Sequence, residues 1–148
     1  MRIYLDNCCL GRLFDDDTQD RIRLEAEAII LIIDRVRDGE IELAGSRVLL
    51  EENSCDRDDR RRRRTGKLLS LVGIHVDLNS GDEQRAEYLQ KLGLGMADSF
   101  HVVAAEKGRC DALLTTDDGL IRKAARHNKS LRVRVVNPLD WLREHGDD

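Results

Sequence analysis

Short apolar segments alternate with helix-like segments along the whole chain, and this alternation restricts the fold more than any other feature. The hydrophobic period changes between about two residues, as in a strand, and about 3.6 residues, as on one face of a helix. The expected strands cover residues 2–5, 41–44, 74–78, 112–115 and 133–136. Strands separated by helices in this way are typical of α/β proteins with a mainly parallel sheet covered on both faces.

The longest expected helix has Thr18 as its N-cap, ends at Gly39 and carries an apolar stripe that includes Ile29, Ile30 and Ile33. Further helices are expected over residues 46–55, 82–92, 97–107 and 118–127, with a charged helix after Cys55 and a short one opened by Asn137–Pro138. The chain has one Pro and no Gly/Ser-rich linker. Residues 1–148 are therefore expected to form a single α/β domain.

Composition excludes several classes of protein. Lys and Arg number 25 against 29 Asp and Glu, and the net charge of -4 argues against a protein that coats nucleic acid through positive charge. Aromatic residues make up only 3%, too few for stacking platforms that bind single strands. The longest apolar stretch, Ala28–Ile33, is much shorter than the roughly 20 residues that span a bilayer. We expect no membrane association.

A location in the cytoplasm is expected from two further observations. The chain begins with a strand-like segment and has no apolar region of the kind found in signal peptides. The four cysteines Cys8, Cys9, Cys55 and Cys110 show no Cys-x-x-Cys spacing, which is a poor framework for disulfides. Cys8 and Cys9 are interpreted as small buried side chains, because no second pair of His or Cys lies at ligand spacing.

Four carboxylates stand where a parallel sheet gathers its ligands, outside the carboxyl ends of the strands. Asp6 follows the first strand and Asp117 follows the fourth, while Asp98 lies in the first turn of its helix and Glu52 lies six residues after the expected N-cap Ser46. Carboxylates brought together repel each other unless a cation lies between them. Mg²⁺ and Mn²⁺ prefer such oxygen ligands. Taken singly, Asp6 and Asp117 are equally explained as turn and helix-cap residues.

The sequence resembles the PIN-domain ribonucleases, and the resemblance rests on four stretches. These are YLDNCCLGR, SRVLLEEN, MADSFHVVAAEKGRCDALLTTDDGLIRKA and VVNPLDWLRE, which together extend from Arg2 to Glu144. The resemblance implies a PIN-like α/β/α sandwich with a five-stranded sheet, in which acidic residues bind Mg²⁺ or Mn²⁺ and RNA is cleaved. By motif, Asp6, Asp98 and Asp117 match acidic positions of that family. It also implies a VapC-like toxin with an antitoxin partner, and a homodimer.

The second acidic position is open between two neighbours. Glu51 and Glu52 lie about 100° apart on a helix, so only one can face the metal. Glu52 lies one turn after Val48, on the buried side, and is preferred. Asp118 raises a similar question: it is interpreted as an N-cap or first-turn residue, with a role as an extra ligand as the alternative.

Several other residues have a functional and a structural interpretation. The run Arg60–Arg64 could bind the phosphates of RNA, but ion pairs such as Asp56–Arg60 and Asp59–Arg63 on a solvated helix are favoured. Arg12 and Ser99 are expected to support the acidic site directly, and Asn7 to cap the helix after the first strand. His101, three residues after Asp98, could lie near the metal, but a histidine at the edge of the core is favoured.

These observations favour a metal-dependent endoribonuclease whose ligands are Asp6, Glu52, Asp98 and Asp117. One alternative is a degenerate PIN-like module that only binds a protein. Another is a receiver-like signalling domain, which would need paired acids after the first strand and a Lys after the fifth. Here Asp6 is followed by Asn7, and no Lys follows Val136.

Overall fold

Five strands form one sheet in the order β3-β2-β1-β4-β5, and every neighbouring pair is parallel. The structure is a computed structural model that describes residues 1–16 and 18–146. The strands are β1 (Arg2–Leu5), β2 (Glu42–Ser46), β3 (Ile74–Val76), β4 (Ala112–Leu114) and β5 (Arg134–Val136). The α/β class and the five-stranded parallel sheet are confirmed, and each strand lies within two residues of its predicted bounds.

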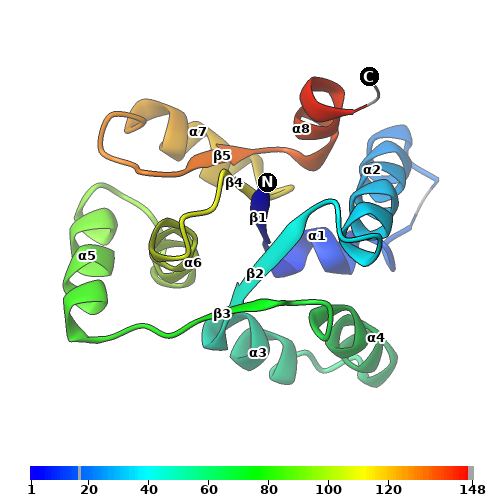
Figure 1. The fold of residues 1–148 in the computed structure, drawn as a ribbon, viewed down its shortest axis with the longest axis horizontal. Coiled ribbons are helices and arrows are strands. Elements are labelled where there is room, and N and C mark those ends of the chain that lie inside the picture. The colour runs from blue at the N-terminus through cyan, green and yellow to red at the C-terminus, as the bar shows by residue number, and fades with distance from the viewer. Residues whose placement is uncertain (17, 147–148) are drawn as a thin grey trace.

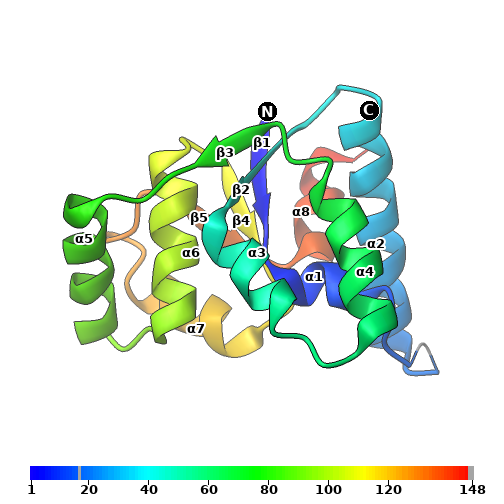
Figure 2. The same ribbon diagram turned by 90° about the horizontal axis from the view of Figure 1, so that it is seen from below.

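Helices cover both faces of this sheet, which gives the predicted α/β/α sandwich (Figure 1). In the described residues they are α1 (Asn7–Arg12), α2 (Asp20–Arg37), α3 (Arg47–Ser54), α4 (Asp59–Leu69), α5 (Ser80–Lys91), α6 (Met96–Lys107), α7 (Asp118–Arg126) and α8 (Pro138–His145). Figure 2 shows α5 and α6 on one side of the sheet and α2, α4 and α8 on the other. Helices α1, α3 and α7 begin where β1, β2 and β4 end.

The central strand is buried on both faces, as expected of a parallel sheet covered by helices. Ile3, Tyr4 and Leu5 of β1 are all 0–1% exposed, and the whole of β4 is buried beside them. The register pairs Leu5 with Leu114, so Asp6 and Thr115 follow these strands side by side. Within the described residues, none of the helices combines the length and the apolar character needed to cross a bilayer.

The strand order places a topological switch point at the centre of the sheet. From β1 the chain moves outward through β2 to β3, and it then returns to place β4 on the other side of β1. Ligands of open α/β sheets bind in the crevice at such a point, outside the carboxyl ends of the two strands. Receiver domains have the order 2-1-3-4-5 instead. The receiver-like alternative is therefore wrong, because β3 lies at the edge rather than beside β1.

Helix α2 differs from its prediction at its start and in its buried face. Gln19, not Thr18, is the N-cap, and the Thr18 N–H donates a hydrogen bond to the side chain of Asp16. Ile30 is 49% exposed although it was placed in the apolar stripe. The buried positions are Glu25, Ala28, Ile29, Ile32 and Ile33. The face that packs on the core is thus rotated and includes a carboxylate.

Candidate active site

Asp6 lies at the carboxyl end of β1 and is only 7% exposed. It occupies the N-cap position of α1, but its side chain caps no backbone N–H. Its Oδ2 atom accepts hydrogen bonds from the Thr115 hydroxyl at 3.1 Å and from the Cys8 thiol at 3.4 Å. Its Oδ1 atom faces the imidazole of His101, 3.9 Å from Nε2. The side chain is therefore held from the β4 side and points into the crevice.

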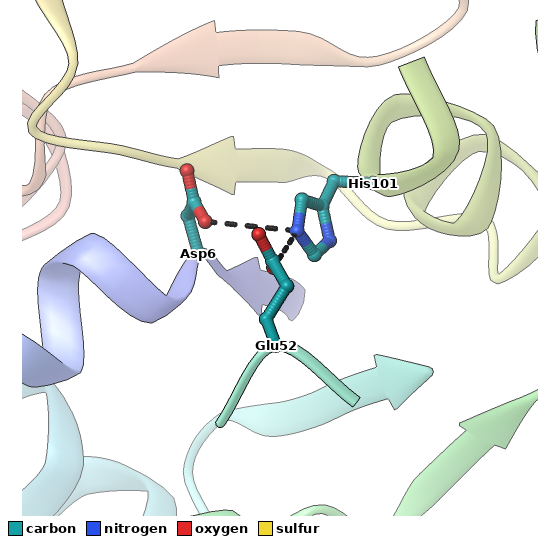
Figure 3. A group of neighbouring side chains, drawn as sticks. All are labelled: Asp6, Glu52 and His101. Atoms are coloured by element: carbon teal, nitrogen blue, oxygen red, sulfur yellow. Dashed lines mark hydrogen bonds and ion pairs between the residues drawn. The ribbon is translucent and has the colours of Figure 1, made fainter. Parts of the chain in front are cut away.

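Glu52 and His101 meet Asp6 from two other helices. Glu52 projects from α3, in the turn after the buried Leu49, and its Oε1 atom contacts Nε2 of His101, which projects from α6. One ligand atom from each of the three side chains lies within 4.8 Å of the other two. Figure 3 shows them converging between β1, α3 and α6. Glu51, the alternative to Glu52, instead forms an ion pair with Arg47 at 3.1 Å on the outer side of α3.

His101 is buried and belongs to a chain of polar side chains beneath the crevice. The Tyr4 hydroxyl lies 2.7 Å from Nδ1 of His101 and 2.7 Å from the Ser46 hydroxyl. Burial alone would lower the pKa of His101, but the hydrogen bond to Glu52 and the negative charges of Asp6 and Glu52 outweigh it and raise the pKa. The favoured interpretation as a core-edge histidine missed these contacts, although the i+3 spacing from Asp98 pointed to the crevice.

Asp98 and Asp117 border the same crevice but do not join the group of three, as far as the described residues show. Asp98, in the first turn of α6, has a raised pKa, first because it is half-buried and then because Asp6 and Asp117 are negatively charged neighbours. Asp117 is the exposed N-cap of α7, and its Oδ1 atom accepts from the N–H groups of Gly119 and Leu120. Asp117 therefore does act as a cap, as the structural interpretation held.

Several residues expected to support the site have other partners. Arg12 pairs with Asp15 and Glu25, and the Ser99 hydroxyl donates to the Gly95 carbonyl of its own helix, so neither contacts a proposed ligand. Their local geometry explains this, because Arg12 ends α1 on the side facing α2, and Ser99 is fully buried.

Three residues expected at the starts of helices contact other elements, and Asp118 is a first-turn residue, as one of its two predicted positions had it. Asn7 is the first residue of α1 rather than its cap, and its side-chain amide donates to the Leu49 carbonyl and to Glu52. Ser46 stands at the N-cap of α3 without a side-chain cap, because its hydroxyl is taken by Tyr4. Asp118, in the first turn of α7, forms a two-fold ion pair with Arg21.

An open groove with a volume of about 1130 Å³ extends from the crevice toward the arginine run. Its lining includes residues of the crevice, namely Glu52, Cys8, Thr116 and Asp117. It also includes charged residues at and after the end of α1 and around the start of α4: Arg12, Asp15, Asp56, Arg57, Asp58 and Arg61. The acidic crevice thus opens into a groove that carries arginines.

The arginine run forms ion pairs, and one of them, Asp59–Arg62, has the predicted helical spacing, although neither of the two pairs expected from the sequence is formed in the described residues. Arg61 binds Asp56 through two nitrogens at 2.6 and 3.0 Å, and Arg62 binds Asp59 at 2.7 Å. The expected pair Asp56–Arg60 assumed that Asp56 is helical, and Asp59 pairs with Arg62 instead of Arg63. Helix α4 begins only at Asp59, after the N-cap Asp58, so Asp56 lies outside the spacing rule. Salt bridging to Arg61 lowers the pKa of Asp56 to about 2.

The carboxylates of the crevice have no Lys or Arg partner in the part of the chain that the structure describes. Within residues 1–16 and 18–146, no Lys or Arg forms an ion pair with Asp6, Glu52, Asp98 or Asp117. The Oδ1 oxygen of Asn7, beside Glu52, is buried and has no hydrogen-bond partner in the described part of the chain. Carboxylate and amide oxygens with one imidazole nitrogen are a donor set that suits a divalent cation. The residues present therefore fit a metal site.

Comparison with known proteins identifies the fold. No family model matches the sequence, and no curated protein matches it. Among solved structures, a chain of VapBC2 from Rickettsia felis, bound to a DNA fragment from their promoter, aligns with a TM-score of 0.56 and 15% identity over 93% of this chain and 98% of that one. PAE2754 from Pyrobaculum aerophilum aligns with a TM-score of 0.55 and 15% identity over 99% of this chain and 91% of that one. The chain therefore shares the fold of these two proteins, and this fold is the PIN-like α/β/α sandwich that the motifs predicted.

Proposed function

We propose that the chain is a divalent-metal-dependent endoribonuclease whose ligands are Asp6, Glu52, Asp98 and Asp117. The observation that carries this proposal is the group of carboxylates at the switch point of the sheet, buried or half-buried in part and not neutralised by Lys or Arg within the described residues. Like charges crowded in this way are unfavourable unless a cation binds between them. The likeness of the fold to VapC-like proteins supports the same function.

Each residue of the crevice has a definite part in this proposal. When bound, Mg²⁺ or Mn²⁺ supplies positive charge that stabilises the attacking and leaving oxygens of a displacement at phosphorus. Asp6 is fixed for ligation by the Thr115 hydroxyl, and Glu52 by the Asn7 amide. The pKa of Asp98 is raised by burial and by its acidic neighbours, so a cation bound beside it would relieve this unfavourable charge and favour the ionised form that ligates.

The groove provides the place for an RNA strand in the same proposal. Arg57 and Arg61 line it a short way from Glu52 and Asp117. Guanidinium groups bind phosphate oxygens with two parallel hydrogen bonds. Arg61 is already engaged by Asp56, so Arg57 would hold the backbone while the crevice acts on one bond. On the motif resemblance we also propose that the chain is a toxin that acts in the cytoplasm, binds an antitoxin protein and forms a homodimer.

Cleavage of a labelled single-stranded RNA by the purified chain tests the proposal. We expect cleavage with Mn²⁺ or Mg²⁺, none with a chelator, and a loss of at least about 10²-fold in Asp6→Asn. The control is Asp140→Asn, which changes an exposed carboxylate on α8, outside the crevice. Cleavage by Asp6→Asn at the parental rate would contradict the proposal. A folded chain that cleaves no RNA and binds a protein partner would favour the degenerate module instead.

A further inference from the structure

We infer that His101 is a nitrogen ligand of the same cation, so that Asp6, Glu52 and His101 form a mixed oxygen and nitrogen site that selects Mn²⁺ over Mg²⁺. This inference rests on the proposed metal-dependent function and specifies which ion serves it. It follows from the position of the imidazole, which is a ligand type that a site built only from carboxylates lacks.

The geometry of the three side chains carries the inference. Nε2 of His101 contacts Oε1 of Glu52 and lies 3.9 Å from Oδ1 of Asp6. All three atoms lie within 4.8 Å of one another, and Figure 3 shows them directed at the same space. Because two of them are carboxylate oxygens and the third is an imidazole nitrogen, one cation can be reached by all three side chains.

Burial fixes the imidazole in this orientation. His101 is 1% exposed, and it packs against the ring of Tyr4 with centroids 5.6 Å apart. It lies three residues after Asp98 on α6, so both side chains project from the same face of that helix toward the crevice. A histidine so enclosed loses little conformational freedom when it binds a metal ion.

The second ring nitrogen has the partner that a metal-binding histidine needs. A ligating imidazole usually donates its other N–H to a fixed acceptor, which sets its tautomer and orientation. Here Nδ1 lies 2.7 Å from the Tyr4 hydroxyl, which lies 2.7 Å from the Ser46 hydroxyl. The Tyr4 hydroxyl is buried between these two partners. It can accept from Nδ1 and donate to Ser46, and Nε2 is then free to face the carboxylates.

The donor set determines which ion is preferred. Mg²⁺ is a hard cation that takes oxygen ligands almost exclusively. Imidazole nitrogen favours first-row transition metals, and Mn²⁺ accepts both nitrogen and carboxylate oxygen. Replacing an oxygen by Nε2 of His101 therefore strengthens Mn²⁺ binding relative to Mg²⁺. Tyr4 and Ser46 act through His101 and are positioning residues.

Pulsed electron paramagnetic resonance of the full chain loaded with Mn²⁺ tests the inference directly. We expect an echo modulation from a directly bound ¹⁴N nucleus, which changes to that of ¹⁵N when the protein is made with ¹⁵N-histidine. This measurement needs no variant and does not depend on RNA cleavage. In His101→Gln the modulation should disappear, and in the control His75→Gln, which changes an exposed histidine of β3, it should remain.

Calorimetric titration with Mn²⁺ and with Mg²⁺ provides the second measurement. We expect Mn²⁺ to bind at least about 10-fold more tightly than Mg²⁺, and Tyr4→Phe to weaken Mn²⁺ binding about 10-fold with a smaller effect on Mg²⁺. Mn²⁺ bound without nitrogen modulation would overturn the inference, and RNA cleavage under those conditions would leave the proposed function standing. A chain that binds neither ion would overturn both.

Discussion

Asp6 and Glu25 are both buried carboxylates, but they differ in the charge of the side chains that surround them. Glu25, which is 1% exposed on α2, lies 3.1 Å from Arg12 and 3.4 Å from Arg21 and accepts a hydrogen bond of 2.6 Å from the Asn137 amide. Asp6, which is 7% exposed, is held by a hydroxyl and a thiol, and its other oxygen faces a histidine and a second carboxylate.

The difference distinguishes Glu25, a carboxylate that stabilises the fold, from Asp6, a carboxylate suited to bind a cation. At Glu25 the chain itself supplies the opposite charge, and the contacts join α1, α2 and α8. At Asp6 the chain adds further negative charge from Glu52 and Asp98. The pKa of Asp98 is raised first by burial and then by its acidic neighbours. Burying a charge without neutralising it is unfavourable. The crevice is therefore an arrangement that a divalent cation would complete.

The largest effect on stability should come from removing the Glu25 carboxylate and with it the ion pairs that neutralise it. Glu25→Ala leaves Arg12 and Asn137 without their shared partner inside the protein, and we expect it to lower the free energy of unfolding by about 3 kcal/mol. Glu25→Gln keeps an oxygen acceptor and should lower it less. Urea denaturation measures both values.

Glu27→Ala is the matched control, because Glu27 is exposed on the same helix. It should change the free energy of unfolding by no more than about 0.5 kcal/mol. Equal effects at Glu25 and Glu27 would show that the network around Glu25 does not stabilise the fold.

In the crevice around Asp6, Glu52→Gln should reduce RNA cleavage about 10²-fold while leaving the fold intact. The physical reason is that Glu52 contacts His101 in the crevice, whereas Glu51 pairs with Arg47 outside it. Glu51→Gln, one residue away on the same helix, should cleave within about 2-fold of the parent chain. If the two variants exchange these effects, the ligand on α3 is Glu51.

The groove predicts a moderate effect on substrate binding. Arg57 lines the groove, is exposed and enters no ion pair among the described residues, so it is available to phosphate. Arg57→Ala should raise KM about 5-fold with little change in kcat, and it should reduce the dependence of KM on salt concentration. A change in kcat with an unaltered KM would place Arg57 in the reaction rather than in RNA binding.

The smallest effect is a gain in stability from removing a crowded charge. Because burial and acidic neighbours raise the pKa of Asp98, its ionised form destabilises the metal-free fold. The protonated carboxyl stabilises the fold relative to the ionised one. This stabilisation is fully present below the pKa that Asp98 has in the unfolded chain, and it is lost as pH rises through the raised pKa in the folded chain. Asp98→Asn should therefore raise Tm at neutral pH by about 2 °C in the metal-free protein, and the difference should vanish in acid. Thermal unfolding at several pH values checks this, and a lower Tm for Asp98→Asn at neutral pH would contradict it.

The fold could be predicted because its evidence is local. Buried strands appear as short apolar runs such as Ile3–Leu5, and an amphipathic helix repeats its apolar positions within a few residues. Asp6 and Asp117 were located because they directly follow strands whose order and direction set one edge of the sheet. These features need no knowledge of which helix packs against which.

The contacts that complete the site could not be predicted, because each joins distant parts of the chain. His101 meets Glu52 across 49 positions and Tyr4 across 97, which depends on how α6 packs against α3 and β1. Glu25 looks like any polar helix residue until Arg12 and Asn137 are brought to it. The pair Asp56–Arg60 was wrong because it assumed a helix that begins only at Asp59, whereas Asp59–Arg62 within that helix follows the spacing rule.

Diffraction from crystals equilibrated with Mn²⁺, recorded at the manganese absorption edge, tests the central claim most directly. The claim is that the crevice carboxylates, unlike Glu25, are neutralised by a divalent cation. The account predicts an anomalous peak within bonding distance of Asp6 and none beside Glu25. A Mn²⁺-saturated crystal without a peak at Asp6, or with its strongest peak elsewhere on the chain, would contradict it.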